Sequence, residues 1–146
     1  MMNEVLVTIR GQQRTREEEG EVIEVIVPGH YQLRDGCHYL TYEEMLDDSD
    51  AITKTLVKFT PAQMEMVRKG HINSRMIFAP GKETVTDYRT PFGDITAEIT
   101  TFDLSVEAQE EKIDLQLRYS MLLGGAFAQD STVEMEIRPA RPEIHL

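Results

Sequence analysis

Apolar and polar residues alternate along most of this chain, as they do in β-strands that bury one face. The clearest alternation runs from Ile113 to Met121, where a polar residue separates each apolar one from the next. Runs of the same kind lie between turn signals such as Pro28-Gly29, Asp35-Gly36 and Pro80-Gly81. The pattern predicts about nine strands and no helix of about ten residues or more.

Three of the turn signals carry specific expectations. Asp35-Gly36 predicts a two-residue hairpin, because a type I′ turn needs positive φ at both central residues. Pro28-Gly29 is expected to end a strand over residues 21–27, so that residues 30–34 form a separate short strand. Gly124-Gly125 is assigned to the last long loop.

Strands at this regular spacing, mostly polar on one face, predict an all-β fold that is either an antiparallel barrel or a sandwich. The length of 146 residues fits one domain over residues 1–146. A chain of this size buries roughly 68–70% of its unfolded surface, so it needs no disulfide or metal to fold. The continuous series of hairpins favours an up-and-down barrel over a sandwich.

The stretch from Thr86 to Asp94 is expected to join two long strands. Pro91 fixes its own φ, and Gly93 supplies positive φ at no steric cost. Tyr88 and Thr90 share one face of the strand that leads into this turn. These two hydroxyl-bearing residues are therefore the first candidates on that face for contacts with a ligand.

The composition is 40% hydrophobic and 28% charged, which is typical of a soluble globular protein. The net charge of −11 argues against binding to nucleic acids or to anionic membranes, because both are negatively charged. We expect neither a transmembrane helix nor a secretory signal peptide, because the necessary continuous apolar runs are missing. Cys37 is the only cysteine, which agrees with a reducing compartment, so a cytoplasmic location is expected.

Several phrases recur here in the order and spacing of a known family. They are Gly29-His-Tyr31, Tyr39-Leu-Thr-Tyr42-Glu43-Glu44, Thr55-Leu-Val-Lys58-Phe, Val67-Arg68-Lys-Gly70, Met76-Ile-Phe78 and Tyr88-Arg-Thr90-Pro91-Phe92-Gly93. Together they resemble the YwiB-like family, bacterial proteins of unknown function. The resemblance extends over nearly the whole chain, and its most specific phrase is the last. It implies an antiparallel calycin- or lipocalin-like barrel of about eight to ten strands, and it brings no catalytic motif.

Arg68 is the sharpest candidate for a functional side chain. It shares strand parity with Met64 and Met66, so it points into the barrel if these methionines do. A buried guanidinium needs a carboxylate, an aromatic face or a ligand anion, because an unpaired buried charge is costly. The interpretation that we favour is structural, with Arg68 closing one end of the barrel against a carboxylate. The carboxylates considered are those of Glu43, Glu44 and Asp87.

The functional interpretation makes Arg68 part of a ligand site inside an apolar barrel. The residues that would bind the ligand are then Arg68, Tyr88, Thr90 and Tyr119. A tyrosine hydroxyl at the mouth of a barrel can donate to a ligand. More often the ring packs in the core and the hydroxyl bonds a backbone carbonyl, and that interpretation is preferred.

No catalytic residue, metal site or cofactor is expected. Cys37 and His38 are adjacent, so they point to opposite faces of a strand and cannot easily bind one zinc ion together. The chain has no phosphate-binding loop, no dinucleotide-binding motif and no nucleophile elbow.

The first hypothesis for function is a non-enzymatic barrel that binds a small apolar or amphipathic ligand.

The second hypothesis is a structural or protein-interaction barrel whose interior is filled by side chains. A cavity with Arg68 and Tyr88 in its wall would favour the first, and a packed interior with an exposed apolar patch would favour the second. An enzyme that uses carboxylates near Arg68 is ranked last. The sequence leaves the formation of homo-oligomers open.

Overall fold

The structure is a computed structural model, and it describes residues 3–45, 52–70, 73–91 and 93–140, apart from the side chains of Tyr88 and Thr90. The described residues form strands and turns, and none of them belongs to a helix long and apolar enough to cross a membrane. The strands are β1 (Glu4–Arg14), β2 (Ile23–Arg34), β3 (Cys37–Met45), β4 (Ile52–Thr60), β5 (Gln63–Gly70), β6 (Ser74–Phe78), β7 (Glu83–Thr90), β8 (Gly93–Ala108), β9 (Ile113–Leu123) and β10 (Ala126–Pro139).

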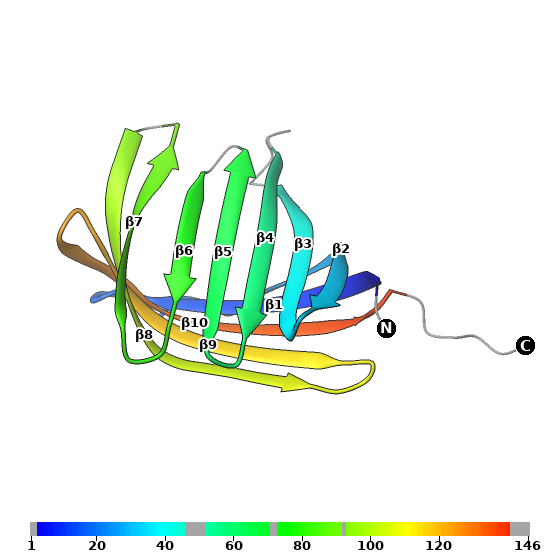
Figure 1. The fold of residues 1–146 in the computed structure, drawn as a ribbon. Coiled ribbons are helices and arrows are strands. Elements are labelled where there is room, and N and C mark those ends of the chain that lie inside the picture. The colour runs from blue at the N-terminus through cyan, green and yellow to red at the C-terminus, as the bar shows by residue number, and fades with distance from the viewer. Residues whose placement is uncertain (1–2, 46–51, 71–72, 92, 141–146) are drawn as a thin grey trace, which may run out of the picture.

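These strands form one antiparallel sheet that curls into a nearly closed ring (Figure 1). Strands β1 to β6 pair in chain order, strands β7 to β10 do the same, and β1 pairs with β10. The two outer strands of the sheet, β6 and β7, meet where the backbones of Asn73 and Arg89 exchange hydrogen bonds of 3.0 and 2.9 Å. Thr84 Oγ1 also donates to the carbonyl of Ile77 at 2.5 Å. The predicted up-and-down antiparallel barrel is confirmed.

Long strands carry the sheet around the corners of the barrel. Strand β2 pairs with β1 over residues 23–30 and with β3 over residues 29–34. Strand β8 pairs with β7 over residues 93–100 and with β9 over residues 97–108, with an irregularity at Phe102. In Figure 1 the short strands β3 to β6 therefore lie across the long strands β1, β8, β9 and β10.

The expectation that Pro28-Gly29 ends a strand is wrong, because β2 continues through both residues. Tyr31 N donates at 2.8 Å to the carbonyl oxygen of Asn3, the residue that precedes β1. Consecutive residues of a strand direct their N–H groups to opposite neighbouring strands, so even-numbered residues of β2 face β3. Pro28 therefore lacks its donor on the β3 side and leaves the β1–β2 ladder intact. The proline ends the pairing between β2 and β3 rather than the strand itself.

Of the two predictions for turns that contain glycine, one is confirmed and the other is wrong. Asp35 and Gly36 have φ values of 50° and 78°, as a type I′ hairpin requires, so that prediction is confirmed. Gly124 and Gly125 have φ values of 60° and 82° and join β9 directly to β10. The long loop expected at this point is therefore wrong, because two adjacent residues with positive φ make a tight hairpin.

The barrel interior is filled by the side chains on the inward-facing side of each strand. The predicted parities hold, because Met64 and Met66 on β5 and alternate residues of β9 are buried. Val57 and Phe59 on β4 are buried as well. The largest fully buried side chains are Phe59, Phe78, Leu40, Met64, Ile99, Ile113, Leu115 and Ile137. This apolar core is the main source of stability, at roughly 25 cal/mol for each Å² of apolar surface buried.

We expect Gly29→Ala to lower the free energy of unfolding by about 1–3 kcal/mol, because overpacking a dense site forces the backbone apart. A Cβ atom at Gly29 would lie 2.7 Å from the carbonyl oxygen of Thr41. The matched control is Gly11→Ala on β1, where the nearest atom would be 4.0 Å away. Urea denaturation measures both variants, and equal stabilities would contradict the prediction.

Candidate ligand-binding site

A cleft opens on the barrel wall where β2 and β3 separate. The residues of β2 that precede Gly29 pair only with β1, and the residues of β3 that follow Tyr42 pair only with β4. The space between them has a volume of about 1150 Å³ and reaches the outer faces of β4 and β5. Its floor consists of the buried residues Val5, Tyr42 and Thr55. The cleft thus follows directly from the position of Pro28.

The walls of this cleft are mainly apolar. Val25 and Ile26 on one side are 45% and 61% exposed, and Met45 and Ile52 on the other are 67% and 47% exposed. Large apolar residues are usually buried, so several exposed ones around one concavity indicate a site for a ligand or a partner. The other apolar lining residues are Val27, Pro28, Leu56, Val67 and Ala140. The charged and titratable lining residues are Glu4, His30, Glu43, Lys54 and Lys69.

Arg68 lies inside the barrel next to the floor of the cleft. Its Nη2 atom is 3.6 Å from Oε1 of Glu44, and both side chains are about three-quarters buried. Thr55, a floor residue of the cleft, donates from Oγ1 to the same carboxylate at 3.3 Å. The pKa of the buried Tyr42 is raised, first by burial and then by the Glu44 carboxylate, while Arg68 opposes the shift. This polar cluster closes one end of the apolar interior.

Of the four residues predicted to bind a ligand, the structure describes the side chains of two, Arg68 and Tyr119. Arg68 faces Glu44, whereas Tyr119 packs in the core against Phe78 with ring centroids 4.8 Å apart. The side chains of Tyr88 and Thr90 lie outside the described part of the chain, although their backbones pair with β8. Ligand binding by these four residues stays a prediction.

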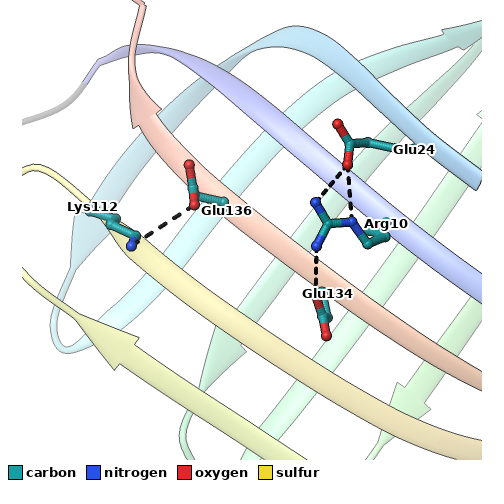
Figure 2. A network of polar contacts seen from close by, with 5 residues as sticks. All are labelled: Arg10, Glu24, Lys112, Glu134 and Glu136. Carbon is teal, nitrogen blue, oxygen red and sulfur yellow. Dashed lines mark hydrogen bonds and ion pairs between the residues drawn. The ribbon is translucent and has the colours of Figure 1, made fainter.

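A network of charged side chains covers the outer surface over β1, β2, β9 and β10 (Figure 2). Arg10 donates to Glu24 at 2.6 and 3.0 Å and to Glu134 at 3.4 Å. Lys112 lies 3.9 Å from Glu136, whose pKa is lowered chiefly by a hydrogen bond from Arg138. A depression of about 220 Å³ lies beside this network, lined by its carboxylates among others.

The charged network supports a structural rather than a binding interpretation. Exposed ion pairs of this kind contribute about 0–1 kcal/mol each to folding stability. They also place opposite charges across neighbouring strands, which favours the pairing of those strands. Within the described residues, no three histidine, cysteine, aspartate or glutamate side chains are grouped so as to hold a metal ion. The cleft between β2 and β3 is therefore the better candidate for a ligand.

A buried pair, Tyr31 and His38, lies within the barrel where β2 meets β3. The hydroxyl of Tyr31 is 2.5 Å from Nδ1 of His38, whose ring stacks on Phe59 with centroids 4.7 Å apart. Burial lowers the pKa of the His38 imidazole and raises the pKa of the Tyr31 hydroxyl. The neutral histidine thus acts as a core residue with one satisfied nitrogen.

Sequence reasoning placed Glu44 among the partners of Arg68 but missed the cleft. The cleft depends on where the β2–β3 ladder ends, and Pro28 is the only local signal of that. By itself, a proline followed by glycine predicts the end of a strand. The missing donor could have marked an interrupted ladder instead, had the strand direction been known.

The family model for "Domain of unknown function (DUF1934)" matches residues 7–135 of the chain. The chain belongs to this family. The DUF1934 assignment agrees with a curated relative, the "Uncharacterized beta-barrel protein YwiB" of Bacillus subtilis, which is 29% identical over 110 residues. That alignment covers 74% of this chain and 76% of the relative. The crystal structure of the Bacillus subtilis ywiB protein matches with a TM-score of 0.84 at 22% identity, over 95% of this chain and 93% of that one.

These matches confirm the resemblance to the YwiB-like family that the sequence phrases indicated. The structural match at this level of identity supports the shared DUF1934 barrel, and it carries no information on activity. Both the family and its curated relative are described as uncharacterised. Function in this DUF1934 protein must therefore be argued from the geometry of the cleft and of the Arg68 cluster.

We expect Arg68→Met to lower the free energy of unfolding by about 1–3 kcal/mol, because it leaves a largely buried carboxylate without its cation. Adding Glu44→Met should recover part of the loss, and the double-mutant cycle measures the coupling. The control is Arg14→Met, whose pair with Glu19 at 3.0 Å is exposed, and we expect a change within about 0.5 kcal/mol. A coupling near zero would remove the structural role assigned to the pair.

His38 predicts a specific dependence of stability on pH. Its pKa is lowered in the folded state, so between that value and about 6.5 the unfolded chain binds more protons. The free energy of unfolding should therefore fall as the pH drops below about 6.5 and through the lowered pKa. His38→Gln should flatten this part of the profile, and exposed His30→Gln should not. Urea denaturation at a series of pH values tests the difference, and parallel profiles would contradict it.

Proposed function

We propose that this protein is a non-enzymatic binding protein for an elongated apolar or amphipathic small molecule. The observation that carries the proposal is the cleft of about 1150 Å³ between β2 and β3, with its apolar walls. Ligand sites in proteins are typically concave, mainly apolar and of about 300–1000 Å³, with a few polar groups that orient the ligand. The cleft has this character, and its volume of about 1150 Å³ lies slightly above this range.

The energetics of the cleft also support an apolar occupant. Val25, Ile26, Met45 and Ile52 each leave about half or more of their surface in water. Burying such a side chain fully is worth about 1.5–3 kcal/mol, so a ligand that covers all four gains several kcal/mol. The interior of the barrel is already occupied by its own side chains, so this proposal places the ligand in the wall.

A second candidate is the docking of a partner protein on the same apolar residues. A filled interior together with exposed apolar residues is the combination expected of an interaction barrel. The depth of the site favours the small molecule, because buried Val5, Tyr42 and Thr55 form its floor. An extended ligand can reach such a floor more easily than a flat protein surface can. The proposal includes no chemical step.

Binding of the neutral apolar dye N-phenyl-1-naphthylamine tests the proposal. We expect fluorescence enhancement with the wild-type protein and an affinity about tenfold lower for Ile26→Asp, since a charge in the wall is costly to desolvate. The matched control is Val85→Asp on β7, because Val85 is 67% exposed and lies outside the cleft.

The two variants should unfold at similar urea concentrations, because both replace exposed side chains. Equal dye affinities for Ile26→Asp and Val85→Asp would contradict a ligand site in the cleft. Concentration-dependent mass in sedimentation velocity that Ile26→Asp abolishes, without any dye binding, would favour the protein-docking alternative.

A further inference from the structure

We infer that the cleft selects amphipathic ligands with a single negative charge, such as a long-chain carboxylate, and that Lys54 and Lys69 bind the anionic group. This inference rests on the proposed function and deepens it by naming the ligand class. It depends on the register of three strands and on the charges that this register places opposite one another.

Lys54 on β4 and Lys69 on β5 are direct partners across the antiparallel ladder. Both line the cleft, so their side chains lie on the same outer face of the sheet. Directly opposed positions bring Cβ atoms to about 4.5–5.5 Å, and like charges there are destabilising. Within the described residues, neither lysine takes part in a salt bridge. The register thus places two like charges at directly opposed positions of the cleft wall, and an anion bound between them would offset their repulsion.

The rest of this face shows the opposite arrangement. Lys58 on β4 lies opposite Glu65 on β5, and Glu65 also binds Arg75 on β6 at 2.9 Å. Opposite charges thus face each other two residues beyond Leu56 and Val67, which line the cleft. The like-charged pair occurs where the cleft is, which is the position that a bound anion would occupy.

The charge of the ligand follows from the third member of the row. Glu43 on β3 is the ladder partner of Lys54 and also lines the cleft. The row Glu43–Lys54–Lys69 carries a net charge of one positive unit, so a monoanion neutralises the row. Glu4, the other carboxylate of the lining, lies on β1 and opposes any further negative charge. The whole chain carries −11, which disfavours polyanions and anionic membrane surfaces as occupants. A free amphiphile with one carboxylate fits both conditions.

The apolar part of the ligand has a defined direction. Leu56 and Val67 are ladder partners beside the lysine pair, and Ile26 and Pro28 form the wall beyond the split. The two paired steps from β5 to β3 span about 10 Å at about 4.8 Å for each step, and the split between β3 and β2 adds to this distance. A ligand with its head group at the lysines can therefore cover the exposed isoleucines and valines on β2 with a long alkyl chain.

The experiment compares dodecanoate with dodecan-1-ol, at pH 8 and low salt, by isothermal titration calorimetry. We expect wild-type protein to bind dodecanoate more tightly, because charge-assisted hydrogen bonds are stronger than neutral ones. In the double variant Lys54→Met/Lys69→Met, dodecanoate affinity should fall about tenfold, and dodecan-1-ol affinity should change less than about twofold. The matched control is Lys58→Met, which changes the same face outside the cleft lining.

Two further arms define the ligand class. Dodecyl phosphate, a dianion at this pH, should bind no more tightly than dodecanoate, and tighter binding would overturn the assignment of a single charge. Vesicles of phosphatidylglycerol and phosphatidylcholine should not co-sediment the protein. Co-sedimentation lost in Lys54→Met/Lys69→Met would assign the lysine pair to a membrane instead of a free amphiphile, and would overturn the inference.

The outcomes separate this inference from the proposed function. Equal affinities for dodecanoate and dodecan-1-ol, unchanged in the double lysine variant, would overturn the lysine site and leave an apolar ligand site standing. Absence of binding by both ligands and by N-phenyl-1-naphthylamine would overturn both. A loss of dodecanoate binding that Lys58→Met shares would reduce the effect to general surface charge and overturn the specific site.

Discussion

The backbone hydrogen-bond ladder of β2 is the constraint on which the barrel and its cleft both depend. Strand β2 must pair with β1 along one half and with β3 along the other, and the two ladders overlap at Gly29 and His30. Close approach of β3 leaves no room for a side chain there. Pro28, with no N–H on the β3 side, stops the second ladder at that residue. One dipeptide thus forms a corner of the barrel and opens its wall.

The separation of the strands divides the protein into two environments. The interior is filled by apolar side chains and closed at one end by Arg68, Glu44 and Tyr42, so it serves stability. The cleft exposes apolar residues and two facing lysines, so it is the part of the described surface that a ligand would stabilise most. Tyr42 belongs to both, because it lines the floor of the cleft and lies in the polar cluster. A ligand bound in the cleft would therefore contact a residue that also belongs to the polar cluster of the barrel.

Much of the fold could be predicted from local pattern, because side chains of a strand alternate between faces whatever its partners are. Parity alone placed Met64, Met66 and Arg68 on one face, and the structure has the two methionines buried and Arg68 largely buried. The candidate site was harder. Lys54 and Lys69 are far from each other in sequence for a chemical motif, and only the register of the β4–β5 hairpin brings them together. Val25 and Ile26 are exposed, and nothing local in the sequence shows that β3 turns away from them.

The sequence by itself determined the all-β class, the antiparallel hairpins, the turn at Asp35-Gly36 and the family, because each depends on residues close together in the chain or on their order. Tertiary structure alone decided which strands separate, that Gly124-Gly125 is a tight turn, and which carboxylate faces Arg68. It also decided that two lysines share one apolar cleft. The physical reason is that alternation specifies a face of a strand, whereas the partner across that face is set by hydrogen-bond register and by where each ladder stops.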